Sequence, residues 1–181
     1  NDCSVATPQD VDIINGDMTP PTMECKPTTA FLDNNGLVTI TVADIDNGTT
    51  DNCALDTMFL SQYDYNCSNI PSAIVWLYAI DTNGNIDSCF NTVNVIDTIS
   101  PAALCRDTTI SLNVGAGGID YTFVDGGSTD NCALDYPVFT VVPDTFTVIG
   151  VYPVVLTVVD ASGNTAFCNS TVTVEDSEPP V

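Results

Sequence analysis

The chain has 181 residues, of which 44% are hydrophobic, and its 24 acidic residues face only one lysine and one arginine, for a formal net charge of −22. This balance excludes nucleic acid and anionic membrane surfaces as partners, because both are bound through Lys and Arg. The hydrophobic content argues against a disordered chain, and no apolar run reaches the ~20 residues of a membrane-spanning helix.

Three short proline-containing motifs occur along the chain at similar intervals. They are Asp17-Met-Thr-Pro20-Pro21, Asp97-Thr-Ile-Ser-Pro101 and Asp176-Ser-Glu-Pro179-Pro180. Proline restricts the backbone, so these motifs predict stiff junctions between modules. The expected organisation is a first module at 18–97 and a second at 98–176. Residues 1–17 would end a preceding module or form an N-terminal extension, and 177–181 would lead to a further module.

An internal repeat supports these boundaries. The word Asp-Asn-Cys-Ala-Leu-Asp begins at Asp51 and again at Asp130, 79 residues later. The same offset relates Asp81-Thr-Asn-Gly-Asn85 to Asp160-Ala-Ser-Gly-Asn164 and Cys89 to Cys168. Modules repeated in line form stalks, filaments and adhesive fibres more often than catalysts.

Within each module the sequence pattern indicates β-strands. Residues 37–43 alternate and are rich in Thr and Val, whereas 74–80 and 154–159 are near-continuous apolar runs that end in Asp. The last strand places Cys168, Ser170, Val172 and Val174 on one face, with Asn169 on the other. About seven short strands per module predict an all-β fold of tandem immunoglobulin-like β-sandwich modules. Trp76 lies within the first apolar run, so we expect it in the core.

Eight cysteines without any histidine indicate an oxidising compartment. The first and last strands of a sandwich can be neighbours, which predicts the disulfides Cys25–Cys89 and Cys105–Cys168. Cys53 and Cys67 would then pair within the first module. Cys132 has no counterpart of Cys67, so it and Cys3 are left over; Cys132 would be a buried thiol or would pair across subunits.

These features together resemble the hyalin-repeat (HYR) family and its relatives in large surface proteins of Bacteroidetes-type bacteria. The shared features are a proline linker, a first-strand Cys, an Asp-Asn-Cys word, an Asp-x-x-Gly-Asn word, and a last Cys before an alternating Val strand and Asp. Lys26 and Arg106 stand where members of the family usually have proline. The resemblance implies an immunoglobulin-like fold and an extracellular adhesive or structural role without catalytic activity.

The acidic residues recur near the predicted junctions, which suggests calcium. The last strand of a module runs towards the next module, so we expect oxygen ligands from three segments to meet there, and Ca²⁺ takes 6–8 of them. The candidate ligands at the first junction are Asp17, Asp46, Asp51, Asp56, Asp81 and Asn85; those at the second are Asp97, Asp125, Asp130, Asp135, Asp160 and Asn164. The alternative for each residue is an Asx-turn or a loop cap without any metal.

Other chemistry is less well supported. The absence of histidine removes the usual catalytic triads and general bases, so we expect no enzyme. Short motifs for N-linked and O-linked glycosylation occur at Asn47, Asn66, Asn169, Thr57, Thr98 and Thr108.

The sequence therefore predicts a secreted or cell-surface structural and adhesive repeat segment. Its partners would be neighbouring repeats, other copies in a filament, or surface glycans and proteins. Two alternatives stay open: a glycan- or protein-binding accessory module of a secreted enzyme, which an exposed aromatic platform would favour, and a self-assembling fibril subunit, which free cysteines would favour.

Overall fold

The computed structural model describes residues 17–112, 117–135 and 139–176 of the chain. The chain divides into two compact units, the first formed by Asn1–Leu32 and Leu37–Ile96 and the second by Asp33–Gly36 and Asp97–Val181. The regular structure of each unit is mainly β-strands, arranged in two sheets. The fold is therefore all-β, with immunoglobulin-like β-sandwich modules in tandem.

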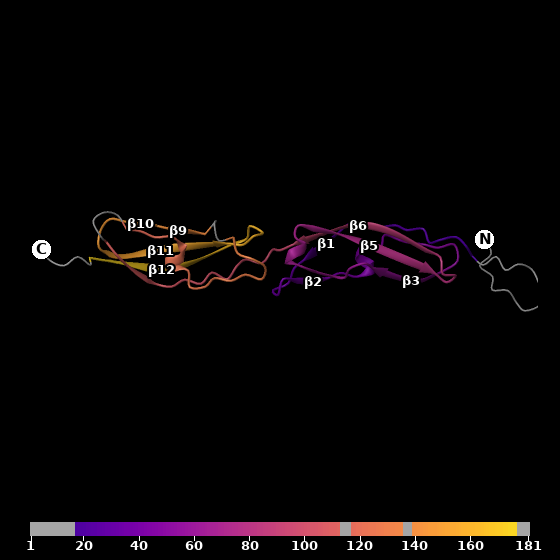
Figure 1. The fold of residues 1–181 in the computed structure, drawn as a ribbon, viewed down its shortest axis with the longest axis horizontal. Coiled ribbons are helices and arrows are strands. Elements are labelled where there is room, and N and C mark those ends of the chain that lie inside the picture. The colour runs from indigo at the N-terminus through magenta and orange to yellow at the C-terminus, as the bar shows by residue number, and fades with distance from the viewer. Residues whose placement is uncertain (1–16, 113–116, 136–138, 177–181) are drawn as a thin grey trace, which may run out of the picture. The chain divides into compact units, whose positions relative to one another are not determined.

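The first unit contains the strands β1 (Thr28–Phe31), β2 (Leu37–Thr39), β3 (Leu55–Leu60), β4 (Asp64–Asn66), β5 (Ser72–Asp81) and β6 (Ile86–Ile96). One sheet has the order β1-β6-β5-β3 and the other pairs β2 with β4 (Figure 1). Strand β1 runs parallel to β6, whereas β5 pairs antiparallel with both β6 and β3. A helical turn, α1 (Val42–Ile45), and a 3₁₀ turn, η1 (Cys67–Asn69), connect the strands.

The second unit repeats this arrangement. Its strands are β7 (Thr108–Ser111), β8 (Gly117–Gly118), β9 (Thr140–Val142), β10 (Thr145–Phe146), β11 (Gly150–Val159) and β12 (Thr165–Glu175), and its helical turn is α2 (Tyr121–Val124). The sheets have the orders β7-β12-β11-β9 and β10-β8. Each sheet of the first unit thus has its counterpart, strand by strand, in the second.

The cores are formed by residues that alternate along the two long central strands. Val75, Leu77 and Ala79 of β5 are fully buried, and Val154, Leu156 and Val158 occupy the same places on β11. On β12, Val172 and Val174 are buried while Asn169 is exposed, which confirms the predicted faces of the last strand.

Two predictions about the strands are wrong. The predicted strand over 37–43 ends at Thr39, and α1 follows because Asp44 Oδ2 accepts the Thr41 backbone N–H at 2.7 Å, which closes a helical turn. Trp76 is not in the core but 41% exposed, because it alternates with the buried Val75 and Leu77. Because the residues on both sides of Trp76 are all apolar, the sequence does not show that one face of this strand is buried and the other exposed.

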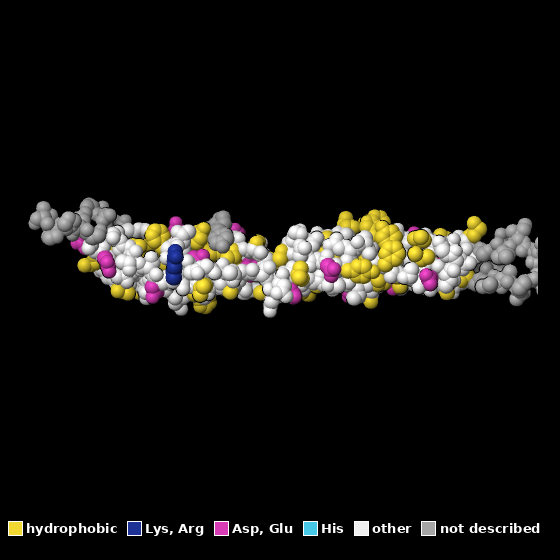
Figure 2. Space-filling view, turned by 60° about the horizontal axis from the view of Figure 1, so that its bottom comes forward, with side chains coloured by type: hydrophobic (Ala, Val, Ile, Leu, Met, Phe, Trp, Pro, Cys, Tyr) yellow, Lys and Arg dark blue, Asp and Glu magenta, His cyan; other side chains and the backbone are white. Residues whose placement is uncertain are grey.

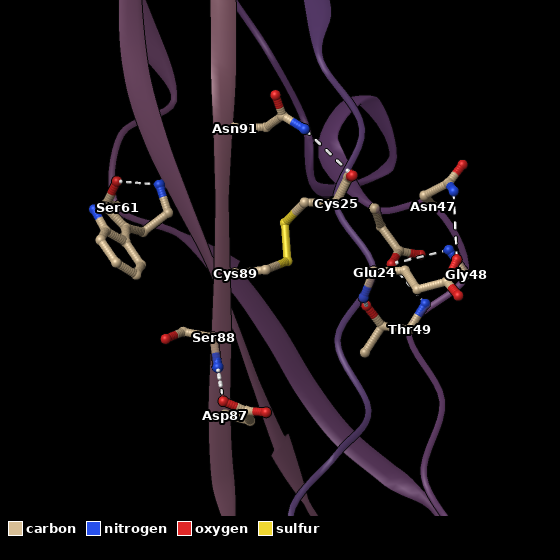
Figure 3. Close-up of a disulfide and its surroundings, with 12 residues drawn as sticks. Glu24, Cys25, Asn47, Gly48, Thr49, Ser61, Asp87, Ser88, Cys89 and Asn91 are labelled. Atoms are coloured by element: carbon tan, nitrogen blue, oxygen red, sulfur yellow. Dashed lines mark hydrogen bonds between the residues drawn. A yellow bond between two sulfur atoms is a disulfide. The ribbon is translucent and has the colours of Figure 1, made fainter.

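Disulfides link the first segment of each unit to its last strand, as predicted. Cys25 is bonded to Cys89 and Cys105 to Cys168, with Cα–Cα distances of 6.0 and 5.8 Å. Figure 3 shows the first of these bonds, beside which the Asn91 side-chain amide donates to the Cys25 carbonyl oxygen at 3.3 Å. The covalent link and the hydrogen bond fasten the segment before β1 onto β6.

The remaining described cysteines, Cys53, Cys67 and Cys132, are also disulfide-bonded. The expectation that Cys132 is a buried thiol is therefore wrong. The pairing of Cys53 with Cys67 stays a prediction, and Cys3 lies outside the described residues.

Candidate metal centre

Three carboxylates meet in the second unit. Asp97 precedes the first strand of the unit, Asp130 lies in the loop after α2, and Asp160 directly follows β11. One oxygen from each lies within 4.8 Å of the others. Asp97 is 5% exposed and Asp160 is 1% exposed, so the carboxylates are gathered in a site with little access to water. We refer to these three residues as the second-unit cluster.

Backbone turns hold each member of the second-unit cluster. Asp160 Oδ1 accepts the backbone N–H groups of Ser162 and Asn164, at 2.9 and 2.8 Å, in a tight turn whose Gly163 has a φ of 91°. The Asn164 side-chain amide then donates to Asp160 Oδ2 at 2.8 Å and to the Asp97 carbonyl oxygen at 3.3 Å. This network explains why both the Asp and the final Asn belong to the repeated word.

Asp97 and Asp130 each have one carboxylate oxygen with a hydrogen-bond partner and one without. Asp97 Oδ1 accepts the Ile99 N–H at 3.1 Å and Asp130 Oδ2 the Cys132 N–H at 3.0 Å. Their other oxygens, Asp97 Oδ2 and Asp130 Oδ1, are buried and have no hydrogen-bond partner. A buried carboxylate oxygen left without a partner is costly, so these two atoms need a cation or another donor to offset their desolvation.

No basic side chain supplies that cation. Lys26 and Arg106 are the only basic residues in the sequence. Arg106 donates to the carbonyl oxygens of Thr122 and Phe123, at 2.7 and 3.3 Å. The positive charge of Lys26 contributes to lowering the pKa of Asp44 and of Asp46, both in the first unit. Burial, together with the negative charges of Asp160 and Asp97, therefore raises the pKa of Asp130, although the Cys132 N–H partly opposes the shift.

A related cluster occurs in the first unit, formed by Asp17, Asp51 and Cys53. Asp17 Oδ2 and Asp51 Oδ1 are again buried without a hydrogen-bond partner. Cys53 is disulfide-bonded, so its sulfur is no thiolate ligand. Asp81 is the equivalent of Asp160 and lies close by, because its Oδ2 and the Asp17 carbonyl oxygen share the Asn85 side-chain amide, at 2.7 and 2.9 Å. We refer to Asp17, Asp51 and Asp81 as the first-unit cluster.

Hydrogen bonds hold two members of the first-unit cluster in the charged form. The Thr19 backbone N–H is the main reason why the pKa of Asp17 is lowered. Burial raises the pKa of Asp81, but hydrogen bonds from Asn85, Asn83 and Gly84 outweigh it and leave that pKa below its ordinary value. Carboxylates that stay ionised are those a hard divalent cation requires.

The structure places the other predicted ligands elsewhere. Asp46 accepts the backbone N–H groups of Gly48 and Thr49, and Asp125 accepts those of Gly127 and Ser128, so both serve as local Asx-turns. Asp56 is exposed on β3, and Asp135 follows the bridge between Leu134 and Asp160. None of these four residues is part of either cluster.

The predicted glycosylation residues lie at the surface. Asn47, Asn66, Asn169, Thr57 and Thr98 are exposed and Thr108 is half-buried. Asn66 also caps η1, since its side-chain oxygen accepts the Ser68 N–H at 2.9 Å. Whether any of these residues is modified stays a prediction.

Comparison with known proteins does not assign the chain to a family. No family model matches it. It is 30% identical over 127 residues to an uncharacterized 81.3 kDa protein of Acholeplasma phage L2, covering 65% of this chain and 16% of that protein. The chain thus spans only a small part of that relative, whose description states no function.

Similar solved structures include cadherin, protocadherin and fibronectin(III)-like domains. They include Drosophila N-cadherin EC1-4 (12% identity, TM-score 0.43, covering 89% of this chain and 51% of that one) and human mucin-like protocadherin EC1-2 (13%, 0.41, 87% and 98%). Fibronectin(III)-like modules of Clostridium thermocellum CbhA are a third (9%, 0.31, 89% and 98%). These identities and TM-scores are too low to indicate a shared function. Among the described residues, no helix is long and apolar enough to cross a membrane.

Proposed function

We propose that this chain is an extracellular structural and adhesive repeat segment of a cell-surface stalk, filament or adhesin, and that calcium ions and disulfides rigidify its modules. The role is mechanical rather than catalytic. Disulfides persist in oxidising compartments, and Cys25–Cys89 and Cys105–Cys168 fit secretion to such a place.

The observation that carries the calcium part is the recurrence of buried, unpartnered carboxylate oxygens at equivalent places in both units. Asp97 and Asp130 contribute them in the second unit, and Asp17 and Asp51 in the first. A single acidic cluster is common at protein surfaces, but loop formation alone does not require the same unpartnered oxygens twice. Hydrogen bonds already orient the opposite oxygen of each of these carboxylates, so the donor set is fixed in advance.

The chemistry of the donor set selects the ion. Carboxylate and carbonyl oxygens are hard ligands that suit Ca²⁺, whereas zinc sites usually include imidazole or thiolate. The chain has no histidine, and all of its described cysteines are disulfide-bonded. Asp97, Asp130 and Asp160 would hold an ion in the second unit, and Asp17, Asp51 and Asp81 in the first.

Thermal melts with calcium and with a chelator, disulfides intact, test the proposal. An ion that binds only the folded state raises its stability by about 2.7 kcal/mol at one hundred times the Kd, so calcium should raise the Tm by several degrees. Asp97→Asn should abolish the part of this increment that belongs to the second unit and keep the part that belongs to the first. In chelator it should leave the Tm equal or higher, because it removes a buried charge that lacks compensation.

Asp56→Asn is the matched control, since Asp56 is exposed and outside both clusters. This variant should keep the full calcium increment. Identical melts of the unmodified protein in calcium and chelator would sink the calcium proposal and leave the aspartates as turn formers.

Self-assembly through intermolecular disulfides has less support than a stalk. Cys132, the residue expected to supply a free thiol, is disulfide-bonded. The glycan-binding alternative has a specific observation in its favour, which concerns a different surface of the first unit.

A further inference from the structure

One face of the first unit carries exposed aromatic side chains. On the outer side of the β3-β5-β6 sheet, Phe59, Trp76 and Phe90 are 40%, 41% and 57% exposed. Figure 2 shows hydrophobic side chains gathered on one face of this unit. We call the outward residues Phe59, Ile74, Trp76, Tyr78 and Phe90 the aromatic face.

The strand register assembles this face from neighbouring residues. Trp76 pairs with Phe90 across β5 and β6, and their ring centroids are 5.0 Å apart. Phe59 pairs with Tyr78 across β3 and β5, with stacked rings 5.1 Å apart. Contacts between the rings fix their positions, so the face is formed before any ligand arrives.

The fold itself does not require these aromatic residues, as the second unit demonstrates. The equivalents of Trp76 and Phe90 are Val155 and Asn169, which pair in the same register between β11 and β12. The equivalent of Tyr78 is Thr157. The buried residues between them are retained, with Leu77 matched by Leu156 and Val93 by Val172. The same sandwich therefore forms without the rings, and an exposed apolar surface that packing does not demand points to recognition.

The face is also uncharged in a strongly acidic chain. The outward positions of β5 and β6 around the rings hold hydroxyl and amide side chains (Ser72, Ser88, Thr92 and Asn94) and two isoleucines (Ile80 and Ile86), but no carboxylate. Ser61 accepts the Trp76 backbone N–H at 3.0 Å at the edge of the rings, and its own hydroxyl hydrogen is left to donate elsewhere. Aromatic rings bordered by neutral hydrogen-bonding groups are the composition of a site for a ligand with both C–H and O–H surfaces.

Charge decides between the candidate occupants. A second copy brings another net charge of −22, and an anionic membrane or anionic glycan is repelled in the same way. A neutral sugar meets no such repulsion, its C–H faces stack on the rings, and its hydroxyls bond the surrounding serine, threonine and asparagine. We propose that the aromatic face of the first unit binds neutral glycans. This rests on the proposed adhesive role, for which it supplies the ligand class, but not on calcium.

The test uses the whole chain and a fixed panel: soluble β-glucan, xylan, mannan and galactan in affinity gel electrophoresis, with cellulose and chitin in sedimentation assays. At least one neutral polysaccharide should retard or retain the protein. Trp76→Ala and Phe90→Ala should each weaken that binding tenfold or more, because aromatic anchors dominate such contacts.

Phe167→Ala is the matched control: Phe167 is 74% exposed on the corresponding face of the second unit, without a Trp partner. This variant should bind like the unmodified protein. Binding should be the same in calcium and chelator, and Trp76→Ala should keep the calcium-dependent melt, so the two proposals fail separately.

Three results would overturn the glycan proposal. They are no binding to any member of the panel, binding unaffected by Trp76→Ala, and a concentration-dependent dimer in sedimentation velocity that Trp76→Ala abolishes. The last result would make the aromatic face a contact between copies of this chain.

Discussion

Individual aspartates in this chain have opposite electrostatic roles. The Thr171 side chain lowers the pKa of Asp107 most, followed by the Thr171 backbone N–H, which donates to Asp107 Oδ1 at 2.8 Å, and by the Ser170 side chain. Asp130 has a raised pKa because burial and neighbouring carboxylates disfavour its charge. The first aspartate stabilises the folded state when ionised, whereas the second destabilises it unless a cation binds.

This difference predicts how Asp130→Asn behaves with pH in chelator. Since the folded-state pKa of Asp130 lies above its ordinary value of 3.8, the folded protein holds this proton more tightly than the unfolded chain. Its contribution to stability is therefore largest below 3.8 and is lost as the pH rises through the folded-state pKa. The free energy of unfolding of Asp130→Asn, relative to the unmodified protein, should increase as the pH rises from about 3.5 to 7.

Urea unfolding at a series of pH values in chelator measures this difference. Asp107→Asn is the opposite case: its lowered pKa means that the ionised side chain stabilises the fold above about pH 4, so the variant should lose stability as the pH rises over the same range. A pH-independent difference for Asp130→Asn would show that its carboxylate is not electrostatically strained in the folded protein.

At the scale of the strand, alternation separates residues that hold the fold from residues that are free to serve another purpose. Leu77 and Leu156 are fully buried in β5 and β11, and each should cost about 2–5 kcal/mol when replaced by alanine. Trp76→Ala, one residue away and partly exposed, should cost less than Leu77→Ala despite its larger side chain. Chemical denaturation of the three variants would test this order, and a larger loss for Trp76→Ala would mean that the aromatic face is structural.

The same alternation explains which elements were predictable. Strand β12 has polar residues between its valines, so its two faces could be assigned from the sequence. In β5 the outward positions are apolar too, and the period of two is not visible; only the structure shows that Trp76 faces outwards. The absence of an equivalent Trp in the second repeat was the available signal, because core positions are retained between the units and this one is not.

The candidate site was predictable in part for a related reason. The common offset marked Asp81 and Asp160, or Asp51 and Asp130, as equivalent positions, and the structure gives each pair equivalent surroundings. Sequence could not separate Asp46 and Asp125 from them, because these two aspartates are related by the same offset of 79 residues. That distinction depends on side-chain hydrogen bonds across more than one loop.

At the scale of the whole molecule, two units of one design carry different surfaces on the same framework. The sheets, the disulfide and the acidic cluster recur, whereas the aromatic face belongs to the first unit alone among the described residues. Such an arrangement fits a repeat protein in which the framework serves mechanical continuity and individual modules acquire binding functions.

Each disulfide should then stabilise the molecule about as much as a large buried side chain does. Cys25–Cys89 and Cys105–Cys168 join residues separated by 64 and 63 positions, and closing loops of this length stabilises the folded state by about 4 kcal/mol in the chain-entropy model. Replacing Cys25 and Cys89 together by alanine should destabilise the first unit by this amount and leave the second unit's transition in place. The equivalent change at Cys105 and Cys168 should do the reverse. Hydrogen exchange, which resolves the two units in one experiment, measures both; equal loss of protection in both units would mean that they unfold as one cooperative body, and that the covalent links stabilise the repeat array as a whole.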